Sequence, residues 1–504
     1  MHRLVAKLAL LLATAVFSVA AHARQLQPAH AAGVSCLLRE RDALLAFKQA
    51  INDTDDGLMS WQRRHKNCCQ WRGVACSNET GHVIELDIGG TKLKGKISPS
   101  LLSLEHLEYL NLNFTNLLGP DGTSLFPEFL CSLSNLRHLD LSWTQFSGRL
   151  PAQLANLSNL EYLDLSSTSM SGILPPQLGN HTNLRHLGLS FMQDIHASDI
   201  SWLTHLHLLE YLDMSDINLS SADVFIVANT IPSLKALILM NCSLPNANQS
   251  LTHVNLTKLE ELNLSRNYLG HRIETCWFWN ITSITDLALV PTYLYGPFPD
   301  ALGSMISLQH LEFNKNGNSS TMTVDLKNLC DLDSLWLDGS LTFANLTDFM
   351  VKLPQCPSSK LRFLSSNHNN MAGMLPDRVG HFTSLKYLFL YNNSITGAIP
   401  TGLLNCTSLQ SVALGLNQLS GQIPTLPRSL TQVDLSMNSL PGPLPSDFGA
   451  PYLTVLSLSS NYITGHVPRP ICELQNLVFL DLSENRFVGE FPGVLQCQTW
   501  YSYT

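Results

Sequence analysis

The sequence predicts an α/β solenoid: a right-handed horseshoe or superhelix with one long parallel β-sheet on its concave side. The first observation is a repeat, because the pattern L-x-x-L-x-L-x-x-N-x-L-x-G-x-I/L-P recurs about every 24 residues. The second is composition: of the 504 residues, 45% are hydrophobic and 14% are charged, which is typical of a folded chain with a large interior. The third is proline, of which there are 25, whereas amphipathic helices would show a 3.6-residue period and few prolines. Clear copies of the repeat start at Leu136, Leu160, Leu385, Leu409, Leu430, Leu453 and Leu477.

The N-terminal segment 1–23 is predicted to be a secretory signal peptide. Its positive end contains Arg3 and Lys7, and the apolar run 8–19 that follows is short for a membrane span of ~20 residues. Ala21-His22-Ala23 offers a small-x-small cleavage site. Residues 29–32 offer a second one, so the start of the mature chain stays open. No later stretch is long and apolar enough to cross a bilayer.

The next segment, 24–82, is predicted to cap the N-terminal end of the solenoid, because an open end would expose core side chains. Residues 40–51 are expected to form an amphipathic helix with Leu44, Leu45, Phe47 and Ile51 on its apolar side. Four cysteines behind a signal peptide indicate two disulfides. They are Cys36 and those of the run Cys68-Cys69-Gln70-Trp71-Arg72-Gly73-Val74-Ala75-Cys76. Adjacent Cys68 and Cys69 are expected to take different partners, since a vicinal bridge is strained.

Residues 83–495 are predicted to form seventeen repeats, the first at Val83 and the last at Leu477. In each repeat the L-x-x-L-x-L segment is a short strand with its leucines pointing inward and its x residues facing solvent on the concave side. An asparagine such as Asn393 turns the chain inward, where its amide satisfies backbone groups that lack a ladder partner. Residues 496–504 are expected to be a tail without a cap. For that reason we expect a fragment, a truncated gene product or an alternative transcript.

The cap and the repeats together resemble a known family. The motif Cys36…Cys68-Cys69-x-Trp71-x-Gly73-Val74-x-Cys76, followed by L-x-G-x-I-P repeats, is similar to plant leucine-rich-repeat receptor-like proteins and receptor kinases. The resemblance covers essentially the whole mature chain, and it implies the bridges Cys36–Cys68 and Cys69–Cys76. The segments Leu329-Cys330-x-Leu332 and Leu353-Pro354-x-Cys356 resemble the receptor-like-protein branch and imply a bridge between Cys330 and Cys356 on the convex side.

The remaining cysteines are expected to be small buried side chains of the repeat rather than metal or redox groups. These are Cys131, Cys242, Cys276, Cys406, Cys472 and Cys497.

Fifteen Asn-x-Ser/Thr sequons behind a signal peptide predict a glycosylated extracellular surface. The candidates are Asn78, Asn113, Asn156, Asn180, Asn218, Asn255, Asn345, Asn392 and Asn405. Other sequons stand at Asn52, Asn241, Asn248, Asn263, Asn280 and Asn318. Occupancy of Asn263 is doubtful because it lies inside a predicted strand.

The sequence predicts a binding protein, not an enzyme, with no catalytic residue, cofactor or metal. The triplet Asp447-Phe448-Gly449 spells a kinase motif, but the other kinase motifs are missing and Phe448 is expected to pack inside its repeat. Carboxylates at one repeat phase are expected to be solvent-facing strand positions rather than an acid/base pair; these are Asp140, Asp164, Asp213, Asp434 and Asp481. The net charge of −9 and the absence of a basic run argue against nucleic acid as a partner.

Aromatic residues at concave positions are the candidate ligand contacts, because binding energy concentrates in such anchors. Near the N-terminal end the candidates are Tyr109, Phe114, Trp143, Tyr162, Phe191 and Tyr211, with His138 and His186 in the same column as the tyrosines. A second concentration contains Trp336, Phe363, Tyr387, Phe389 and Tyr391. Stacking between neighbouring repeats, which would only stabilise the sheet, is an equally weighted alternative.

The family resemblance implies the extracellular recognition part of a receptor-like protein. Such a module binds a protein or peptide ligand on the concave face and signals through a partner receptor-like kinase, with defence as the expected context and the apoplast or plasma membrane as the location. One alternative is a soluble inhibitor of a secreted microbial cell-wall-degrading enzyme, resembling the polygalacturonase-inhibiting leucine-rich-repeat proteins. Another is a non-signalling decoy or gene remnant.

Overall fold

The computed structural model describes residues 35–489, except 54–55, 193, 198, 245–250, 252 and 473. The predicted signal peptide, the tail 496–504, the sequon at Asn248 and Cys497 lie outside the described residues, as does the side chain of Cys472.

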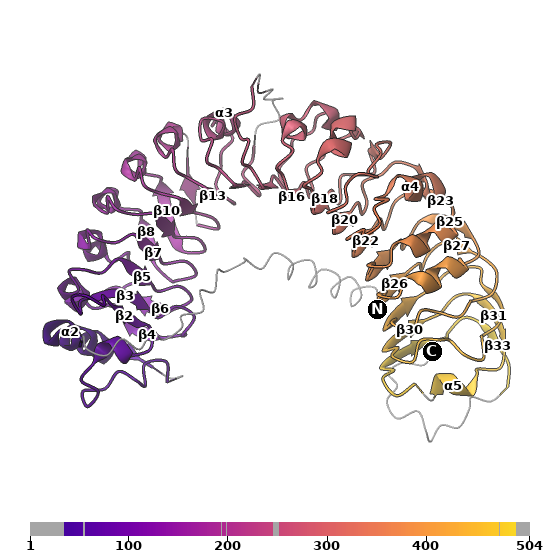
Figure 1. Cartoon of the computed structure of the whole chain (residues 1–504), viewed down its shortest axis with the longest axis horizontal. Helices are drawn as coiled ribbons and strands as arrows, with labels where there is room; N and C mark the ends of the chain where they lie inside the picture. Colours follow the sequence, from indigo (N-terminus) through magenta and orange to yellow (C-terminus); the bar gives the residue numbers. More distant parts are fainter. Residues whose placement is uncertain are drawn as a thin grey trace.

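Seventeen parallel strands, one from each predicted repeat, form the concave sheet and curve into an open arc (Figure 1). Each strand pairs with the strands of the preceding and following repeats, so that equivalent residues stand in register along the whole sheet. The strands are β3 (Val83–Asp87), β5 (Tyr109–Asn111), β7 (His138–Asp140), β9 (Tyr162–Asp164), β11 (His186–Gly188), β13 (Tyr211–Asp213), β14 (Ala236–Ile238), β15 (Glu261–Asn263), β16 (Asp286–Ala288), β18 (His310–Glu312), β20 (Ser334–Trp336), β22 (Phe363–Ser365), β24 (Tyr387–Phe389), β26 (Ser411–Ala413), β28 (Gln432–Asp434), β30 (Val455–Ser457) and β32 (Phe479–Asp481).

Shorter sheets run along one flank of the arc, where the L-x-G-x-I/L-P part of each repeat lies. In the N-terminal half, one sheet contains β1 (Ile51–Asn52), β4 (Lys94–Lys96) and β6 (Asn116–Leu118), and the next contains β8 (Ser147–Arg149), β10 (Ser169–Ile173) and β12 (Ile195–His196). In the middle, β17 (Gly296–Pro297) pairs with β19 (Ser320–Thr321). Farther along the chain, one sheet contains β21 (Ala344–Asn345), β23 (Met371–Met374), β25 (Ser394–Gly397) and β27 (Gln418–Leu419), and the last contains β29 (Pro441–Pro443), β31 (Tyr462–Gly465) and β33 (Arg486–Phe487). The parallel pairing of these flank strands links successive repeats a second time.

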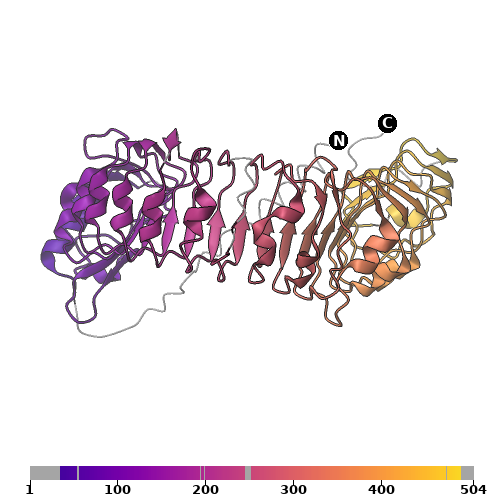
Figure 2. The ribbon, with the colours of Figure 1, turned by 90° about the horizontal axis from the view of Figure 1, so that it is seen from above.

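The convex side is made of short helices, one per repeat in most of the arc (Figures 1 and 2). Three are α-helical: α3 (Val224–Ala228), α4 (Leu346–Lys352) and α5 (Arg469–Cys472). The others are 3₁₀ turns: η2 (Pro99–Ser103), η3 (Glu128–Ser132), η4 (Ala152–Asn156), η5 (Pro176–Asn180), η6 (Ser201–His205), η7 (Ile273–Thr275), η8 (Trp277–Asn280), η9 (Asp300–Ser304), η10 (Asp377–His381) and η11 (Thr401–Asn405). In η5 and its equivalents the prolines at the start fix the entry of the turn.

One continuous core of leucine side chains runs through the arc between the concave sheet and the convex helices. The leucine in the middle of a strand is fully buried, as Leu110, Leu163 and Leu287 illustrate, while the residues on either side of it face the concave surface. Asn393 has the predicted role: its amide donates to the carbonyls of Ser366 and Leu390, at 2.9 and 3.1 Å, and its oxygen accepts from the Met371 N–H.

Helix α2 (Leu38–Gln49) of the N-terminal cap starts and ends two residues earlier than the predicted 40–51. Leu44, Leu45 and Phe47 are buried as predicted. Ile51 instead belongs to β1, because its backbone pairs antiparallel with Gly95 of the first repeat. The cap also places β2 (Val74–Cys76) antiparallel to β3.

A buried carboxylate fastens this cap to the first repeat. Glu40, only 3% exposed, accepts a 2.8 Å hydrogen bond from the Val83 N–H and lies 2.9 Å from Nδ1 of His82.

Three disulfides connect the pairs that the family resemblance implies. Cys36 is bonded to Cys68, Cys69 to Cys76, and Cys330 to Cys356. The free cysteines in the described part of the chain are Cys131, Cys242, Cys276 and Cys406, and all four are buried. Burial raises the pKa of the Cys242 and Cys276 thiols to about 12, which suits the predicted packing role.

Within residues 35–489, no helix has both the length and the apolar composition needed to cross a membrane.

Candidate ligand-binding face

Two columns of aromatic side chains follow the N-terminal half of the concave face. The inner column comes from the first residue of successive strands, and we call it the ring stack: Tyr109, His138, Tyr162, His186 and Tyr211. The outer column comes from the second residue after the last core leucine of the strand, at the edge of the face. We call it the aromatic rim: Phe114, Trp143 and Phe191.

The ring stack is continuous from β5 to β13. Its four centroid distances lie between 3.9 and 4.1 Å, and all four pairs are stacked. Each ring therefore covers a face of its neighbour, and all five side chains are half-buried instead of facing solvent freely as the sequence predicts. In this column the rings therefore stack between neighbouring repeats, as the alternative to ligand contact predicts.

Desolvation keeps rings at the N-terminal end of the stack uncharged. Burial lowers the pKa of His138 to about 3, and the repulsion from neighbouring His186 acts in the same direction. Burial, helped by the charges of Asp87 and Glu85, raises the pKa of Tyr109 to about 12. Tyr109 and His138 are therefore uncharged aromatic rings at neutral and mildly acidic pH.

The aromatic rim remains exposed. Phe114, Trp143 and Phe191 keep 52%, 56% and 44% of their surface in solvent. Phe114 and Trp143 stack at 5.2 Å, and Ser167 of the intervening repeat separates them from Phe191. Large apolar side chains exposed in a row on a folded protein are typical of interaction sites.

The backbone holds the rim residues in the left-handed region, with φ of 52° at Phe114 and 55° at both Trp143 and Phe191. That backbone conformation is unfavourable for most residues other than glycine. Backbone hydrogen bonds between repeats maintain this conformation. The N–H of each rim residue donates to a carbonyl of the next repeat, as from Trp143 to Ser166 at 2.9 Å. The turn therefore projects one side chain per repeat outward at the edge of the face.

Carboxylates lie between the two columns. Asp164 and Asp213 are half-buried and Asp140 is buried, so the predicted solvent-facing phase holds only in part. Each accepts a hydrogen bond from the N–H of the serine two residues later, as Asp140 does from Ser142 at 2.9 Å. This hydrogen bond explains why a carboxylate recurs at the same position of the repeat. It holds the turn that follows the strand.

A charge ladder borders the ring stack on its other side. It alternates between acidic and basic residues in successive repeats: Glu108, Arg137, Glu161, Arg185, Glu210 and Lys235. Arg137 lies 3.1 Å from Glu161, and Lys235 lies 2.7 Å from Glu210. The basic side chains of this ladder are thereby neutralised by their neighbours. Sequence reasoning missed the ladder, although the alternation is readable at the residue after each opening leucine.

The second aromatic concentration is more enclosed than predicted. Trp336 is buried and stacks on Phe363 at 3.7 Å, while Tyr387 is half-buried and donates from its hydroxyl to Oε1 of Gln410 at 3.2 Å. Tyr391 contacts His368 edge-on at 5.6 Å. These rings lie together, on β20, β22, β24 and the turn after it, but they present less free surface than the aromatic rim.

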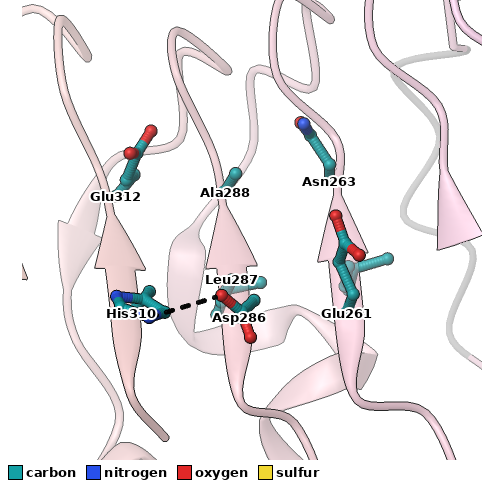
Figure 3. Close-up of a pocket in the computed structure, with 8 residues that line it drawn as sticks. Glu261, Asn263, Asp286, Leu287, Ala288, His310 and Glu312 are labelled. Carbon is teal, nitrogen blue, oxygen red and sulfur yellow. Dashed lines mark ion pairs between the residues drawn. The ribbon is translucent and has the colours of Figure 1, made fainter. Parts of the chain in front are cut away.

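A shallow hollow in the middle of the arc was not predicted (Figure 3). Glu261, Asp286, His310 and Glu312 line it, and Ala288 leaves it open because its side chain is small. Nε2 of His310 lies 3.8 Å from a carboxylate oxygen of Asp286, and Nδ1 of His310 shares a 2.7 Å hydrogen bond with the Ser334 hydroxyl. The sequence signal is the run of acidic residues at strand positions, although only the structure shows that the small Ala288 leaves space beside them.

Seven of the nine candidate glycosylation asparagines are exposed, and the other two are half-buried. Asn113 and Asn392 are the half-buried ones: the amide of Asn113 donates to Asp140 at 2.9 Å, and that of Asn392 lies 2.8 Å from Nδ1 of His368. Asn156, Asn180 and Asn405 share one phase at the end of a convex 3₁₀ turn, away from the concave face. Glycosylation of these positions remains a prediction.

Comparison with known proteins agrees with this architecture. The leucine rich repeat N-terminal domain matches residues 37–77, and the leucine rich repeat matches residues 135–157, 159–181, 384–406, 452–474 and 476–497. Receptor-like protein EIX2 of Solanum lycopersicum is 37% identical over 367 residues, which are 70% of this chain and 33% of that protein. The chain belongs to the plant leucine-rich-repeat receptor-like protein family. Receptor-like protein EIX1 of the same plant is 31% identical over 56% of this chain and 26% of its own length. The chain thus spans a quarter to a third of these two receptor-like proteins.

Solved structures of plant receptor ectodomains have the same fold. The Arabidopsis receptor kinase HAESA, solved with the peptide hormone IDA and the co-receptor SERK1, superposes with a TM-score of 0.64 at 26% identity, over 90% of this chain and 78% of that one. The ectodomain of the Arabidopsis receptor kinase GASSHO1/SCHENGEN3, solved with CASPARIAN STRIP INTEGRITY FACTOR 2, gives a TM-score of 0.63 at 25% identity, over 88% of this chain and 59% of that one. This receptor-like protein is therefore an ectodomain-type solenoid related to those of plasma-membrane receptors.

Proposed function

We propose that this chain is the ligand-recognition part of a plant receptor-like protein, working outside the cell. It binds a protein or peptide on its concave face and passes the signal through a partner receptor kinase, with defence as the context. The proposal treats the chain as a binding module without catalytic turnover.

The aromatic rim is the observation that carries this proposal. Phe114, Trp143 and Phe191 contribute nothing to the leucine core, yet the fold keeps them exposed on the concave side. Large apolar side chains that are exposed together and unused in packing point to binding. The ring stack beside them supplies a rigid aromatic floor that a ligand can cover without ordering new side chains.

Two relatives support the general mode of action by analogy. The HAESA ectodomain was solved in complex with a peptide hormone and a co-receptor, and the GASSHO1/SCHENGEN3 ectodomain in complex with an integrity factor. A solenoid of the same fold offers a comparable concave surface here. Carrying the mode of action to this chain is part of the proposal.

The test uses the glycosylated ectodomain, secreted from plant cells and immobilised. It is exposed to extracellular extracts of microbes and of plants, and the retained proteins are identified by mass spectrometry. The double variant Trp143→Ala with Phe191→Ala is compared with Ile173→Ala, which removes an even more exposed apolar side chain (72%) from the flank strand β10.

We expect at least one protein to be retained by the wild type and by Ile173→Ala, and lost or weakened about tenfold by the rim double variant. Retention of the same proteins by all three forms would show that the rim is not the binding surface. Purified ectodomain that turns over a small molecule unaided would contradict the proposal as a whole.

A further inference from the structure

The charges of the concave sheet are strongly one-sided. The two outward residues of each strand include carboxylates in ten places and neither lysine nor arginine in any of the seventeen strands. The carboxylates are Glu85, Asp87, Asp140, Asp164, Asp213, Glu261, Asp286, Glu312, Asp434 and Asp481. The basic residues of the adjoining ladder already face acidic partners. A partner that complements the sheet therefore carries positive charge.

Two of these carboxylates differ from the others in having no compensation. Asp140 and its equivalents accept hydrogen bonds from serines, and Asp286 accepts one from the Thr285 hydroxyl at 2.6 Å. Within the described residues, the side chains of Glu261 and Glu312 take part in no hydrogen bond or ion pair. The charges that face Glu261 are Asp286 on β16 and Asp213 on β13, and the charge that faces Glu312 is Asp286. Burial, followed by this repulsion, raises the pKa of each to about 7. His310, on the same strand as Glu312, is the remaining titratable group that lines the hollow.

The ring stack ends beside the first of these carboxylates. Tyr211 stacks on His186 at 4.1 Å, and the residue in register on the next strand is Ala236, followed by Glu261. Because alanine is small, no ring of the described residues covers the second face of Tyr211. Tyr211 and Glu261 stand two strand spacings apart, about 10 Å at the backbone. Ala236 itself is only 8% exposed. A planar cation on the concave surface above it would contact the aromatic face of Tyr211 on one side and the carboxylate of Glu261 on the other.

An arginine guanidinium matches both surfaces. It stacks on aromatic rings within about 6 Å of the ring centroid, and it donates two parallel hydrogen bonds to one carboxylate. A lysine ammonium offers only a point charge and lacks the flat face. The shallow hollow next to this position adds the carboxylates of Asp286 and Glu312, which a second cationic side chain of the same segment can approach from the concave surface (Figure 3).

We propose that the concave face between β13 and β18 binds an arginine-bearing segment of the ligand. One guanidinium lies over Ala236, between the ring of Tyr211 and the carboxylate of Glu261, and a second cationic group lies at the mouth of the hollow, near Glu312. This inference rests on the proposed function and adds the chemistry of the ligand to it.

The test measures fluorescence anisotropy of a labelled peptide of alternating arginine and glycine, added to the secreted ectodomain. The matched probe replaces each arginine by citrulline, which keeps the shape and removes the charge. The variants are Glu261→Gln, which removes the charge, and Ala236→Leu, which fills the space and leaves every charge in place. Glu260→Gln is the control, because Glu260 is exposed, immediately precedes β15 and lies off its outward face.

We expect the arginine peptide to bind at least about tenfold more tightly than the citrulline peptide. Glu261→Gln and Ala236→Leu should each weaken its binding about tenfold, and Glu260→Gln should leave it within about twofold. Binding to the wild type should weaken several-fold from about pH 8 to about pH 6, because protonation removes the charges of Glu261 and Glu312.

Three results would overturn the inference: equal binding of both peptides, no binding of either, or equal losses in Glu260→Gln and Glu261→Gln, which would mean unspecific attraction. The two proposals fail separately. A natural ligand that needs the aromatic rim but is indifferent to Glu261→Gln and Ala236→Leu removes this inference and leaves the proposed function in place.

Discussion

At the scale of single residues, His181 is the side chain that fits the repeat least. It follows the convex turn η5, at a position that Leu104, Leu133, Leu157 and Leu206 occupy in neighbouring repeats. His181 is fully buried, and its one polar contact, with the Leu157 backbone, falls short of hydrogen-bond geometry. Burial lowers its pKa, so the ring is held neutral in the fold. An imidazole without a well-formed hydrogen bond in an apolar site costs stability.

We predict that His181→Leu stabilises the ectodomain by about 1–2 kcal/mol at neutral pH. The difference should grow in acid. Since the folded pKa lies below the unfolded value of about 6.5, the unfolded chain binds the proton more readily, and the wild type loses stability as pH falls below that value. Thermal melts at about pH 7 and about pH 5 measure both effects. Identical pH dependence of the wild type and the variant would contradict this account of His181.

At the scale of elements, the ring stack is a device that couples neighbouring strands. Strands of three residues make few backbone hydrogen bonds each, and the five stacked rings add a cross-strand contact at every step from β5 to β13. Aromatic pairs of this kind contribute about 0.5–1.5 kcal/mol beyond their buried area. Tyr162 lies in the centre and contacts a ring on both faces.

We therefore expect Tyr162→Ala to destabilise the sheet locally by about 1–3 kcal/mol, because it removes two stacked contacts. Tyr162→Phe keeps the ring and should be nearly neutral. Amide hydrogen exchange checks this: protection should fall in β7, β9 and β11 in the alanine variant, and remain unchanged in β24 and β26. Equal protection in all forms would mean that the leucine core alone holds these strands.

The cap depends on another element-scale contact, between α2 and the first strand. We predict that Glu40→Ala costs about 1–3 kcal/mol, because the N–H of Val83 would be buried without its 2.8 Å acceptor. The control is Asp42→Ala, since Asp42 is an exposed carboxylate on the same helix. Limited proteolysis should cut the cap sooner in Glu40→Ala than in Asp42→Ala, and equal rates would argue against the buried carboxylate as the fastener.

At the scale of the whole molecule, the arc is held by contacts between neighbours. Each strand of the sheet pairs only with the adjacent repeats, so stability is close to a sum of repeat and interface terms. The described N-terminal end is capped by α2, β2 and two disulfides. A defect in the middle should therefore separate two cooperative units instead of unfolding the chain at once.

We predict that Leu287→Asp, in the fully buried centre of β16, costs more than about 4 kcal/mol and divides the unfolding transition into two steps. The capped strands β3 to β13 should keep their hydrogen-exchange protection longer than β18 to β32. The control is Asp286→Asn, one residue away, because Asp286 is only half-buried and its side chain faces the concave surface, outside the leucine core. A single transition in Leu287→Asp would show longer-range cooperativity than neighbour contacts provide.

The leucine periodicity was enough to predict the arc and its seventeen strands, since inward leucines at a fixed phase leave few other arrangements. Family resemblance added the three disulfide pairs. The exposure of aromatic residues was predicted less well, because it depends on side-chain packing across repeats: Tyr162 and Phe191 are both on the concave side, yet only Phe191 is exposed. The hollow at Glu261 and Glu312 was missed for the same reason, as it needs three strands and the small Ala288 together.

The left-handed turn at the edge of the face has an evolutionary consequence. Backbone hydrogen bonds to the next repeat hold this turn, and it needs no particular side chain. Residues as different as Phe114, Ser167, Asp216, Arg266 and Leu416 all adopt it. Most residues other than glycine, asparagine and aspartate bear a similar conformational penalty there, so exchanging one of them for another is close to neutral for folding. New specificities can accordingly arise by single replacements along this edge, one per coil, while the scaffold beneath is inherited unaltered.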